Sequence, residues 1–147
     1  MLRQLALADM DMAAGVHRMA FDQAMPWLAG LHTPDEDRWF YRERVFPTRR
    51  VWGRFDGDEL CGIIAFRDGW GEQLYVLPVA QGRGVGSELL DIAKGASDRL
   101  ELWTFQRNAA ARRFYEARGF KLIEETDGAR NEEREPDARY CWRRPGQ

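Results

Sequence analysis

The chain has 147 residues, with 22 basic and 24 acidic side chains and a formal net charge of −2 at pH 7. This length suits one domain, residues 1–147, which buries a core without metal or disulfide support. The near-neutral charge offers no positive field for nucleic acid or an anionic membrane, so neither is expected as a partner. The first 15 residues carry acidic side chains and no long apolar run, which argues against a signal peptide or membrane span and favours a cytoplasmic protein.

Four segments have the apolar spacing and end signals of α-helices. The second opens with a capping box, formed by Thr33 at the N-cap, Pro34 at the first helical position and Glu36 three residues after the cap. Gly119 follows the fourth at a position where glycine often ends a helix. The expected helices cover residues 10–25, 34–46, 85–96 and 109–118.

Seven shorter segments have the β-branched, aromatic or alternating composition of strands. An Asp-Gly turn between the second and the third predicts a β-hairpin. The expected strands cover residues 4–8, 50–55, 60–66, 73–77, 99–105, 120–126 and 138–144. Because strands come before, between and after the helices, we expect one mixed sheet with helices on its faces.

A glycine-rich turn, QGRGVGS at residues 81–87, separates the strand at 73–77 from the third helix. Such a turn leaves backbone N–H groups bare and lets an anion approach the start of the helix. It is not a dinucleotide-binding fingerprint, because Leu89 stands where glycine or alanine is required, and no Gly-Lys-Ser/Thr follows as in a Walker loop. The glycines alone leave two interpretations open, a phosphate site and a plain tight turn.

Two motifs in order resemble those of the GNAT N-acetyltransferase family. The run LYVLPVAQGRGVGSELL is similar to its acetyl-CoA-binding motif, whose pattern Gln/Arg-x-x-Gly-x-Gly/Ala is met by Gln81, Gly84 and Gly86. The run NAAARRFYEARGF is similar to its second motif, with Asn108, Phe114, Tyr115, Gly119 and Phe120. The resemblance is best over residues 50–126 and implies an α+β (αβα) fold, a mixed and mostly antiparallel sheet of six to seven strands flanked by about four helices.

The resemblance implies acetyl-CoA as co-substrate and no metal. The backbone amides from Arg83 to Ser87 are expected to bind the CoA pyrophosphate, and a backbone N–H near Val76, on a strand with a β-bulge, to polarise the thioester carbonyl. Asn108 either caps the fourth helix only or also bonds to the pantetheine arm. The residues expected to contact CoA are Leu74, Val76, Gln81, Gly82, Arg83, Gly84, Val85, Gly86, Ser87, Asn108, Arg112 and Tyr115.

Two residues are expected to carry the proton transfers. By resemblance, Tyr115 protonates the leaving thiolate, a role that suits a phenol because it is neutral at pH 7, whereas Phe114 on another helix stripe is expected in the core. Glu72 is expected to act as general base or to hold a water that does so. The alternatives are a surface tyrosine and a strand-end surface glutamate. Cys61 and Cys141 match no nucleophile position of the family, so direct attack in a ternary complex is expected.

The acceptor is predicted only in outline. An acidic segment at 127–137 either forms a solvated face or attracts a cationic amine, with aromatic rings to hold it. Each acceptor-site candidate also has an ordinary packing explanation. The candidates are Trp27, His32, Glu36, Trp70, Glu133 and Tyr140.

The sequence therefore predicts an acetyl-CoA-dependent N-acetyltransferase that acts on a primary amine of a small molecule. Two alternatives stay open: acetylation of a protein N-terminus or lysine, and a non-enzymatic CoA-binding sensor or interaction module. A homodimer is possible by analogy with the family.

Overall fold

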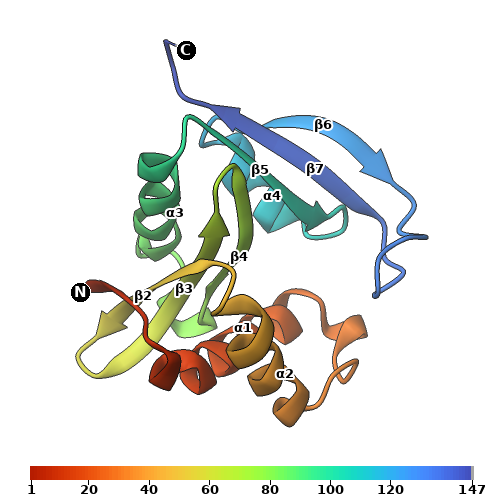
Figure 1. The fold of residues 1–147 in the computed structure, drawn as a ribbon. Coiled ribbons are helices and arrows are strands. Elements are labelled where there is room, and N and C mark those ends of the chain that lie inside the picture. Colours follow the sequence, from red (N-terminus) through yellow and green to blue (C-terminus); the bar gives the residue numbers. More distant parts are fainter. Residues whose placement is uncertain (147) are drawn as a thin grey trace.

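A seven-stranded mixed sheet forms the centre of the computed structural model, which describes residues 1–146 (Figure 1). Its strand order is β1-β2-β3-β4-β5-β7-β6. Every neighbouring pair is antiparallel except β4 and β5, which run parallel. The strands are β1 (Leu2–Gln4), β2 (Arg50–Asp56), β3 (Glu59–Arg67), β4 (Trp70–Val76), β5 (Arg99–Phe105), β6 (Lys121–Thr126) and β7 (Asp137–Arg143).

Four α-helices accompany the sheet, so the expected α+β fold is confirmed. Thr33 caps the second helix as predicted: its hydroxyl accepts from the Glu36 N–H at 3.1 Å, and the Glu36 carboxylate accepts from the Thr33 N–H at 2.7 Å. A π-helical turn, Tyr41–Val45, continues this helix. The helices are α1 (Met10–Ala24), α2 (Pro34–Phe40), α3 (Val85–Ala96) and α4 (Ala109–Glu116).

The first strand is shorter and earlier than the sequence predicts. It covers Leu2–Gln4 rather than 4–8, because Leu7–Asp9 wind into a 3-10 turn that leads directly into α1. Asp9 does not cap α1 with its side chain. Its carboxylate accepts instead from the Ala6 N–H at 2.8 Å and pairs with Arg3 at 3.0 Å, which fixes the turn before the helix.

The core lies on both faces of the central strand β3, whose residues from Leu60 to Phe66 are all buried. Gly62 faces α3 so closely that a Cβ there would stand 2.7 Å from Val85 and 3.1 Å from Leu89. Because successive residues of a strand point to opposite faces, the neighbouring Ile63 faces the other side, where α1 packs against β3. A strand buried on both faces explains the nearly continuous apolar run in its sequence.

The sheet opens between β4 and β5 (Figure 1). These strands pair at one position, Trp70 opposite Glu101, next to a hydrogen bond from the Glu101 N–H to the Gly69 carbonyl at 2.8 Å. Beyond that point β5 turns toward β7 and leaves β4 uncovered on one edge. The opening faces the start of α3 and the cleft described below.

Within residues 1–146, no helix is long and apolar enough to cross a membrane. The same part of the chain contains no group of three or more His, Cys, Asp or Glu side chains placed to hold a metal ion. Cys61 and Cys141 are both free thiols, and burial raises the pKa of Cys61.

Candidate active site

A cleft of about 710 Å³ occupies the opening between β4 and β5. Its walls combine the free edge of β4, the glycine turn with the start of α3, the end of β5, and α4, and α1 closes one side. The predicted CoA contacts that line it are Leu74, Val76, Gln81, Gly82, Gly84, Val85, Gly86, Ser87, Asn108 and Tyr115. Both family-like motifs thus meet at one cavity.

The glycine turn forms a cradle at the start of α3. Gly82 and Gly84 both adopt a left-handed backbone with φ of +81°, which glycine adopts without strain, and open space surrounds the position of a Cβ at each. Gly86 lies in the first turn of α3, where a Cβ would stand 3.1 Å from the Phe114 ring. The first amides of a helix have no intrahelical acceptor, so this cradle fits the pyrophosphate of CoA.

Arg118 supplies a positive charge beside the cradle, a contribution that the sequence analysis missed. Its Nε donates to the Ser87 hydroxyl at 2.7 Å, and its guanidinium carbon lies 3.7 Å from the centre of the Phe114 ring. Both Arg118 and Phe114 line the cleft, and Phe114, partly buried, also packs against the core as expected. In the sequence, Arg118 stands just before Gly119, where the chain turns back toward the sheet, and this position could have indicated a role for it.

Tyr115 lies beside Phe114 in the same wall. Their ring centres are 5.3 Å apart, and Phe120 contacts the other side of Tyr115 at 5.4 Å. Burial raises the pKa of Tyr115 well above its usual value, so the phenol is neutral at physiological pH. No residue in the described range 1–146 forms a hydrogen bond with its hydroxyl, which leaves that O–H available in the cleft.

The backbone of Val76 faces the cleft. Val76 lies opposite Gly62, and the next N–H, that of Leu77, bonds to the Cys61 carbonyl at 2.8 Å. This pattern makes Val76 part of a non-hydrogen-bonded pair, so its N–H and C=O point away from β3. The Gln81 side-chain amide donates to the Val76 carbonyl at 3.1 Å, which leaves the Val76 N–H directed to the opening.

Asn108 caps α4 as predicted: its side-chain oxygen accepts from the Ala111 N–H at 3.2 Å. It also lines the cleft, and a contact to the pantetheine arm stays a prediction.

Glu72 lies at the cleft but is occupied by two arginines. Its carboxylate pairs with Arg67 at 2.6 Å and with Arg49 at 3.4 Å. It is the extra residue of a β-bulge, since Ala65 pairs with Gln73 while Phe66 pairs with Gly71. Both carboxylate oxygens of Glu72 are therefore already engaged by guanidinium groups, which leaves them less accessible to an incoming ammonium.

Several predicted site residues lie outside the cleft. Tyr140 is fully buried under α4, where its hydroxyl donates to Glu116 at 2.7 Å and accepts from Arg112 at 2.9 Å, so no acceptor reaches it. Arg112 is held by that bond and by Glu125 at 3.7 Å, on a face of α4 outside the cleft. Trp70 and Arg83 also lie outside the lining of the cleft.

Trp27 joins two segments of the chain that contain predicted acceptor-site residues. Its indole N–H donates to Glu135 at 2.9 Å, and the Arg107 guanidinium lies 3.8 Å from its ring centre. Arg107 in turn lines the cleft. The connection between α1 and α2 therefore contacts the segment between β6 and β7 beside the opening.

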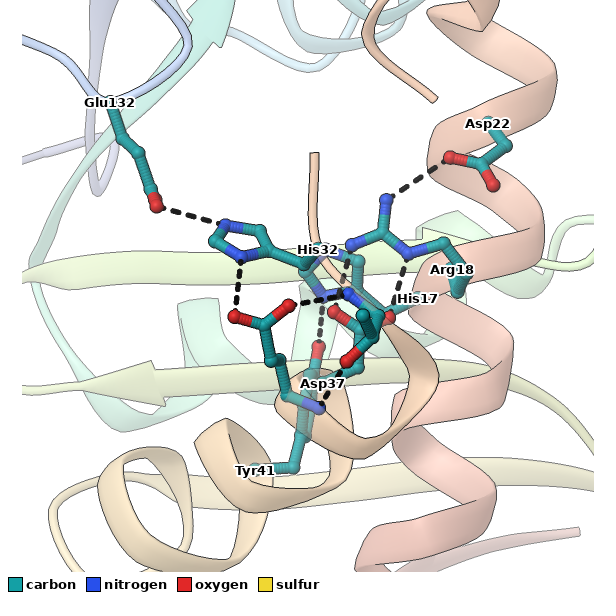
Figure 2. Close-up of polar contacts among 9 residues, drawn as sticks. His17, Arg18, Asp22, His32, Asp37, Tyr41 and Glu132 are labelled. Atoms are coloured by element: carbon teal, nitrogen blue, oxygen red, sulfur yellow. Dashed lines mark hydrogen bonds and ion pairs between the residues drawn. The ribbon is translucent and has the colours of Figure 1, made fainter. Parts of the chain in front are cut away.

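His32 makes a second link between the same two segments (Figure 2). Its Nε2 lies 3.0 Å from the Glu132 carboxylate, and its Nδ1 lies 4.0 Å from Glu36. His32 and Glu36 thus form a surface ion-pair group rather than a wall of the cleft.

A buried polar cluster lies behind this surface, around His17 (Figure 2). The His17 Nδ1 is hydrogen-bonded to the Tyr41 hydroxyl at 2.6 Å, and its ring stacks on Tyr75 with 4.2 Å between centres. Burial lowers the pKa of His17 to about 4, and the nearby Arg18 adds to this effect. Because Tyr75 lines the cleft, the cluster supports the cleft wall from behind.

Comparison with known proteins agrees with this geometry. The model of the acetyltransferase (GNAT) family matches residues 16–120. The peptidyl-lysine N-acetyltransferase YiaC of Escherichia coli (strain K12) is 26% identical over 84 residues, an alignment that spans 56% of this chain and 58% of that protein.

Two solved structures share the fold over nearly the full length. The apo form of YjaB from Escherichia coli has a TM-score of 0.81 with 18% identity, over 97% of this chain and 96% of that chain. The PaiA N-acetyltransferase of Thermoplasma acidophilum, solved in complex with coenzyme A, has a TM-score of 0.72 with 20% identity, over 97% and 98% of the chains. With the family match covering most of the sequence, the chain belongs to the GNAT acetyltransferase family.

Proposed function

We propose that the chain is a single GNAT domain that transfers the acetyl group of acetyl-CoA to a primary amine of a small molecule, by direct attack in a ternary complex. The observation that carries this proposal is the cleft itself, which has a phosphate cradle at one end and the unpartnered Tyr115 hydroxyl in its wall. A protein that only binds CoA has no need of a neutral phenol at that place.

In the proposed reaction, the alkylammonium of the acceptor first loses a proton, because its nitrogen needs a free lone pair to attack. The nitrogen then forms a bond with the thioester carbonyl carbon, and the developing oxyanion accepts a hydrogen bond from the Val76 N–H. The C–S bond breaks as the tetrahedral intermediate collapses, and the nitrogen loses its second proton. The products are the amide and the CoA thiol.

Tyr115 acts on the leaving sulfur in this scheme. Its raised pKa keeps the O–H intact, so it donates a hydrogen bond as negative charge develops on sulfur and supplies the proton of the thiol. The proton released by the nitrogen restores the phenol through solvent. Glu72 assists as a base only where it is released from Arg67 and Arg49, so a water chain fits the first deprotonation better.

Acetylation of a protein lysine is the second candidate, and the similarity to YiaC favours it. The two acceptors present the same primary amine to the cleft, so the chemistry above applies to either. They differ in what surrounds the amine.

The test is thiol release from acetyl-CoA by the purified chain, with a panel of small amines, a lysine peptide and a no-amine control. Release with particular small amines and not with the peptide supports the proposal, and the reverse pattern supports the second candidate. Tyr115→Phe is expected to lower kcat about 10²-fold or more, as removal of a general acid does, with little change in the Kd of CoA measured by calorimetry. Loss of CoA binding together with turnover would contradict the role given to Tyr115.

A further inference from the structure

A second cavity, of about 900 Å³, adjoins the CoA cleft. Trp103, Thr104 and Phe105 at the end of β5 line both cavities, so the two meet along this strand end. The opposite wall is formed by β6 and by the segment 127–137, which we call the acidic loop. A molecule in the second cavity therefore reaches the cleft without crossing the protein core.

The lining of the second cavity is strongly acidic. It contains four carboxylates against one cation, Arg130. Among residues 1–146, a cationic partner is found for one of the four, since Glu124 pairs with Arg139 at 2.8 Å. The four carboxylates belong to Glu124, Asp127, Glu133 and Asp137.

Neutral donors hold two of the remaining carboxylates in place without cancelling their charge. Asp137 accepts from the Thr126 hydroxyl and from the Asn131 side-chain amide, the latter at 3.1 Å. Asp127 accepts from the Ala129 N–H at 2.9 Å. Both carboxylates are therefore oriented by neutral donors rather than by cations.

Glu133 differs from the others in its position. It is half-buried, and in the described part of the chain it forms neither an ion pair nor a side-chain hydrogen bond. Its charge also acts on the CoA cleft: the pKa of Tyr75 is raised, first by burial and then by Tyr115 and Glu133. Glu133 lines the second cavity, which meets the cleft along the end of β5.

Glu135 adds a further carboxylate to the acidic loop, 6% exposed. One oxygen accepts from Trp27, while the other, Oε2, is buried with no hydrogen-bond partner among residues 1–146. Arg107 lies 3.8 Å from this side chain, so its charge is only partly compensated. An orphaned carboxylate oxygen in the same loop strengthens the negative potential on that side.

An aromatic surface completes the cavity. Trp103 is 43% exposed, and its ring forms part of the wall shared with the cleft. An indole face attracts cations and alkyl chains, whereas it offers nothing to a second carboxylate. Acidic oxygens beside an indole are complementary to a flexible chain with a positive charge at its far end.

We propose that the second cavity selects an acceptor amine that carries a second positive charge, with the reacting ammonium beside Glu133 and the distal cation near Asp127 and Trp103. This inference rests on the proposed function, because it names the substrate class of the same site. It excludes amino acids as good acceptors, since their carboxylate would enter a cavity that is already negative.

Three amines with the same carbon chain test this selection: cadaverine, pentylamine and 5-aminopentanoate. We expect kcat/KM to be about tenfold or more higher for cadaverine than for pentylamine, and lowest for 5-aminopentanoate, since one extra charge contact changes affinity by that order. The advantage of cadaverine should shrink as salt rises, because the cavity is open to solvent. Equal values for the three amines, or a preference for 5-aminopentanoate, would overturn the proposal.

Two variants test the contacts of the two ends of the acceptor amine one at a time. Asp127→Asn keeps the bond from the Ala129 N–H and removes only charge, so it should lower kcat/KM for cadaverine several-fold and leave pentylamine unchanged. Glu133→Gln should lower the values for both amines, because both place an ammonium there. The matched control is Glu43→Gln, an exposed carboxylate on the π-helical turn, which should change neither. A cadaverine preference that both site variants leave intact would place the selection elsewhere and refute this site.

Calorimetry separates failure of this inference from failure of the proposed function. Cadaverine is titrated into the protein saturated with CoA, and the Kd is compared between the wild type and Asp127→Asn. Binding that weakens several-fold in the variant, without turnover of any amine, supports the cation site and removes the transferase proposal. Turnover of pentylamine with no measurable cadaverine binding would support the transferase proposal and refute the cation site.

Discussion

Arg18 on α1 and Asp37 on α2 are joined by two parallel hydrogen bonds, from Nε to Oδ2 at 2.7 Å and from Nη2 to Oδ1 at 2.8 Å (Figure 2). Asp37 is only 8% exposed, so the pair fixes the angle between α2 and α1, the helix that closes one side of the cleft. Asp37→Asn should destabilise the fold by about 1–3 kcal/mol, because the half-buried Arg18 guanidinium then loses the carboxylate that accepts two of its hydrogen bonds. Urea unfolding at pH 7 measures this change.

Asp22→Asn is the matched control. Asp22 pairs with the same guanidinium at 3.1 Å, but its side chain is 36% exposed. Exposed pairs on one helix contribute less than about 1 kcal/mol, so this variant should cost clearly less than Asp37→Asn. Equal losses would show that burial does not decide the strength of the pair.

The buried His17 predicts a loss of stability on acidification. Its pKa falls from the usual 6.5 to about 4 in the folded protein, so the unfolded chain binds a proton more readily. The free energy of unfolding contributed by neutral His17 is therefore complete above pH 6.5 and declines as the pH falls toward 4. The groups facing its ring, Tyr41 and Tyr75, stay neutral over this range, since burial raises the pKa of both.

His17→Asn removes the titration and retains a polar side chain. The variant should be less stable at pH 7, and its free energy of unfolding should fall less steeply between pH 6.5 and 4 than that of the wild type. Chemical denaturation at several pH values measures both slopes. Identical slopes would show that His17 does not titrate differently in the folded and unfolded states.

Two glycines of α3 should respond in opposite ways to alanine. At Gly86 a Cβ would meet the Phe114 ring at 3.1 Å and push it into the cleft, so Gly86→Ala should weaken CoA binding about tenfold or more. At Gly95 nothing lies within 4 Å of a Cβ. Gly95→Ala should raise stability by about 0.5–1 kcal/mol and leave CoA binding unchanged. Calorimetry and thermal unfolding of both variants check this, and weaker binding in Gly95→Ala would point to a general effect on the helix.

Gly128, the glycine of the acidic loop, is expected to be hard to replace. It has φ of +81°, and a Cβ would stand 2.4 Å from the backbone of Glu135, so Gly128→Ala must move one side of the loop. Gly57 is the comparison, because it also has a positive φ, of +62°, but nothing within 4 Å. Gly57→Ala should cost about 1 kcal/mol from strain alone, and Gly128→Ala distinctly more. Equal unfolding midpoints in thermal melts of the two variants would contradict this difference.

Local signals in the sequence predicted the helices, the hairpin and the glycine cradle well. The Thr33 capping box and the Gly119 helix end are interactions within a few residues, so single-sequence reasoning finds them. The family resemblance implied that the two motifs lie together, and Gly86 and Tyr115 do line the same cavity.

Apart from the first strand, where a local 3-10 turn was missed, the failures concern the direction of side chains at the site. Tyr140 was predicted at the acceptor site, yet its strand faces α4 and Arg112 is drawn to its hydroxyl. Arg118, in the turn after α4, lines the cleft instead of Arg112, because its side chain reaches Ser87. Glu72 meets Arg67 across the turn between β3 and β4, but Arg49 comes from the segment before β2, and no local pattern predicts that second contact. Side-chain direction at a distance depends on packing that a sequence window does not contain.

Because β4 and β5 pair at a single position, the sheet consists of two parts, β1–β4 and β5–β7, which meet at one end. Along the open edge, the amide of Val76 exchanges with solvent unless a ligand covers it, so its hydrogen exchange reports occupancy of the cleft directly. A ligand bound in the cleft contacts both parts of the sheet, and its binding free energy adds to the stability of their arrangement. A ligand in the opening of the sheet should therefore raise the free energy of unfolding of the protein.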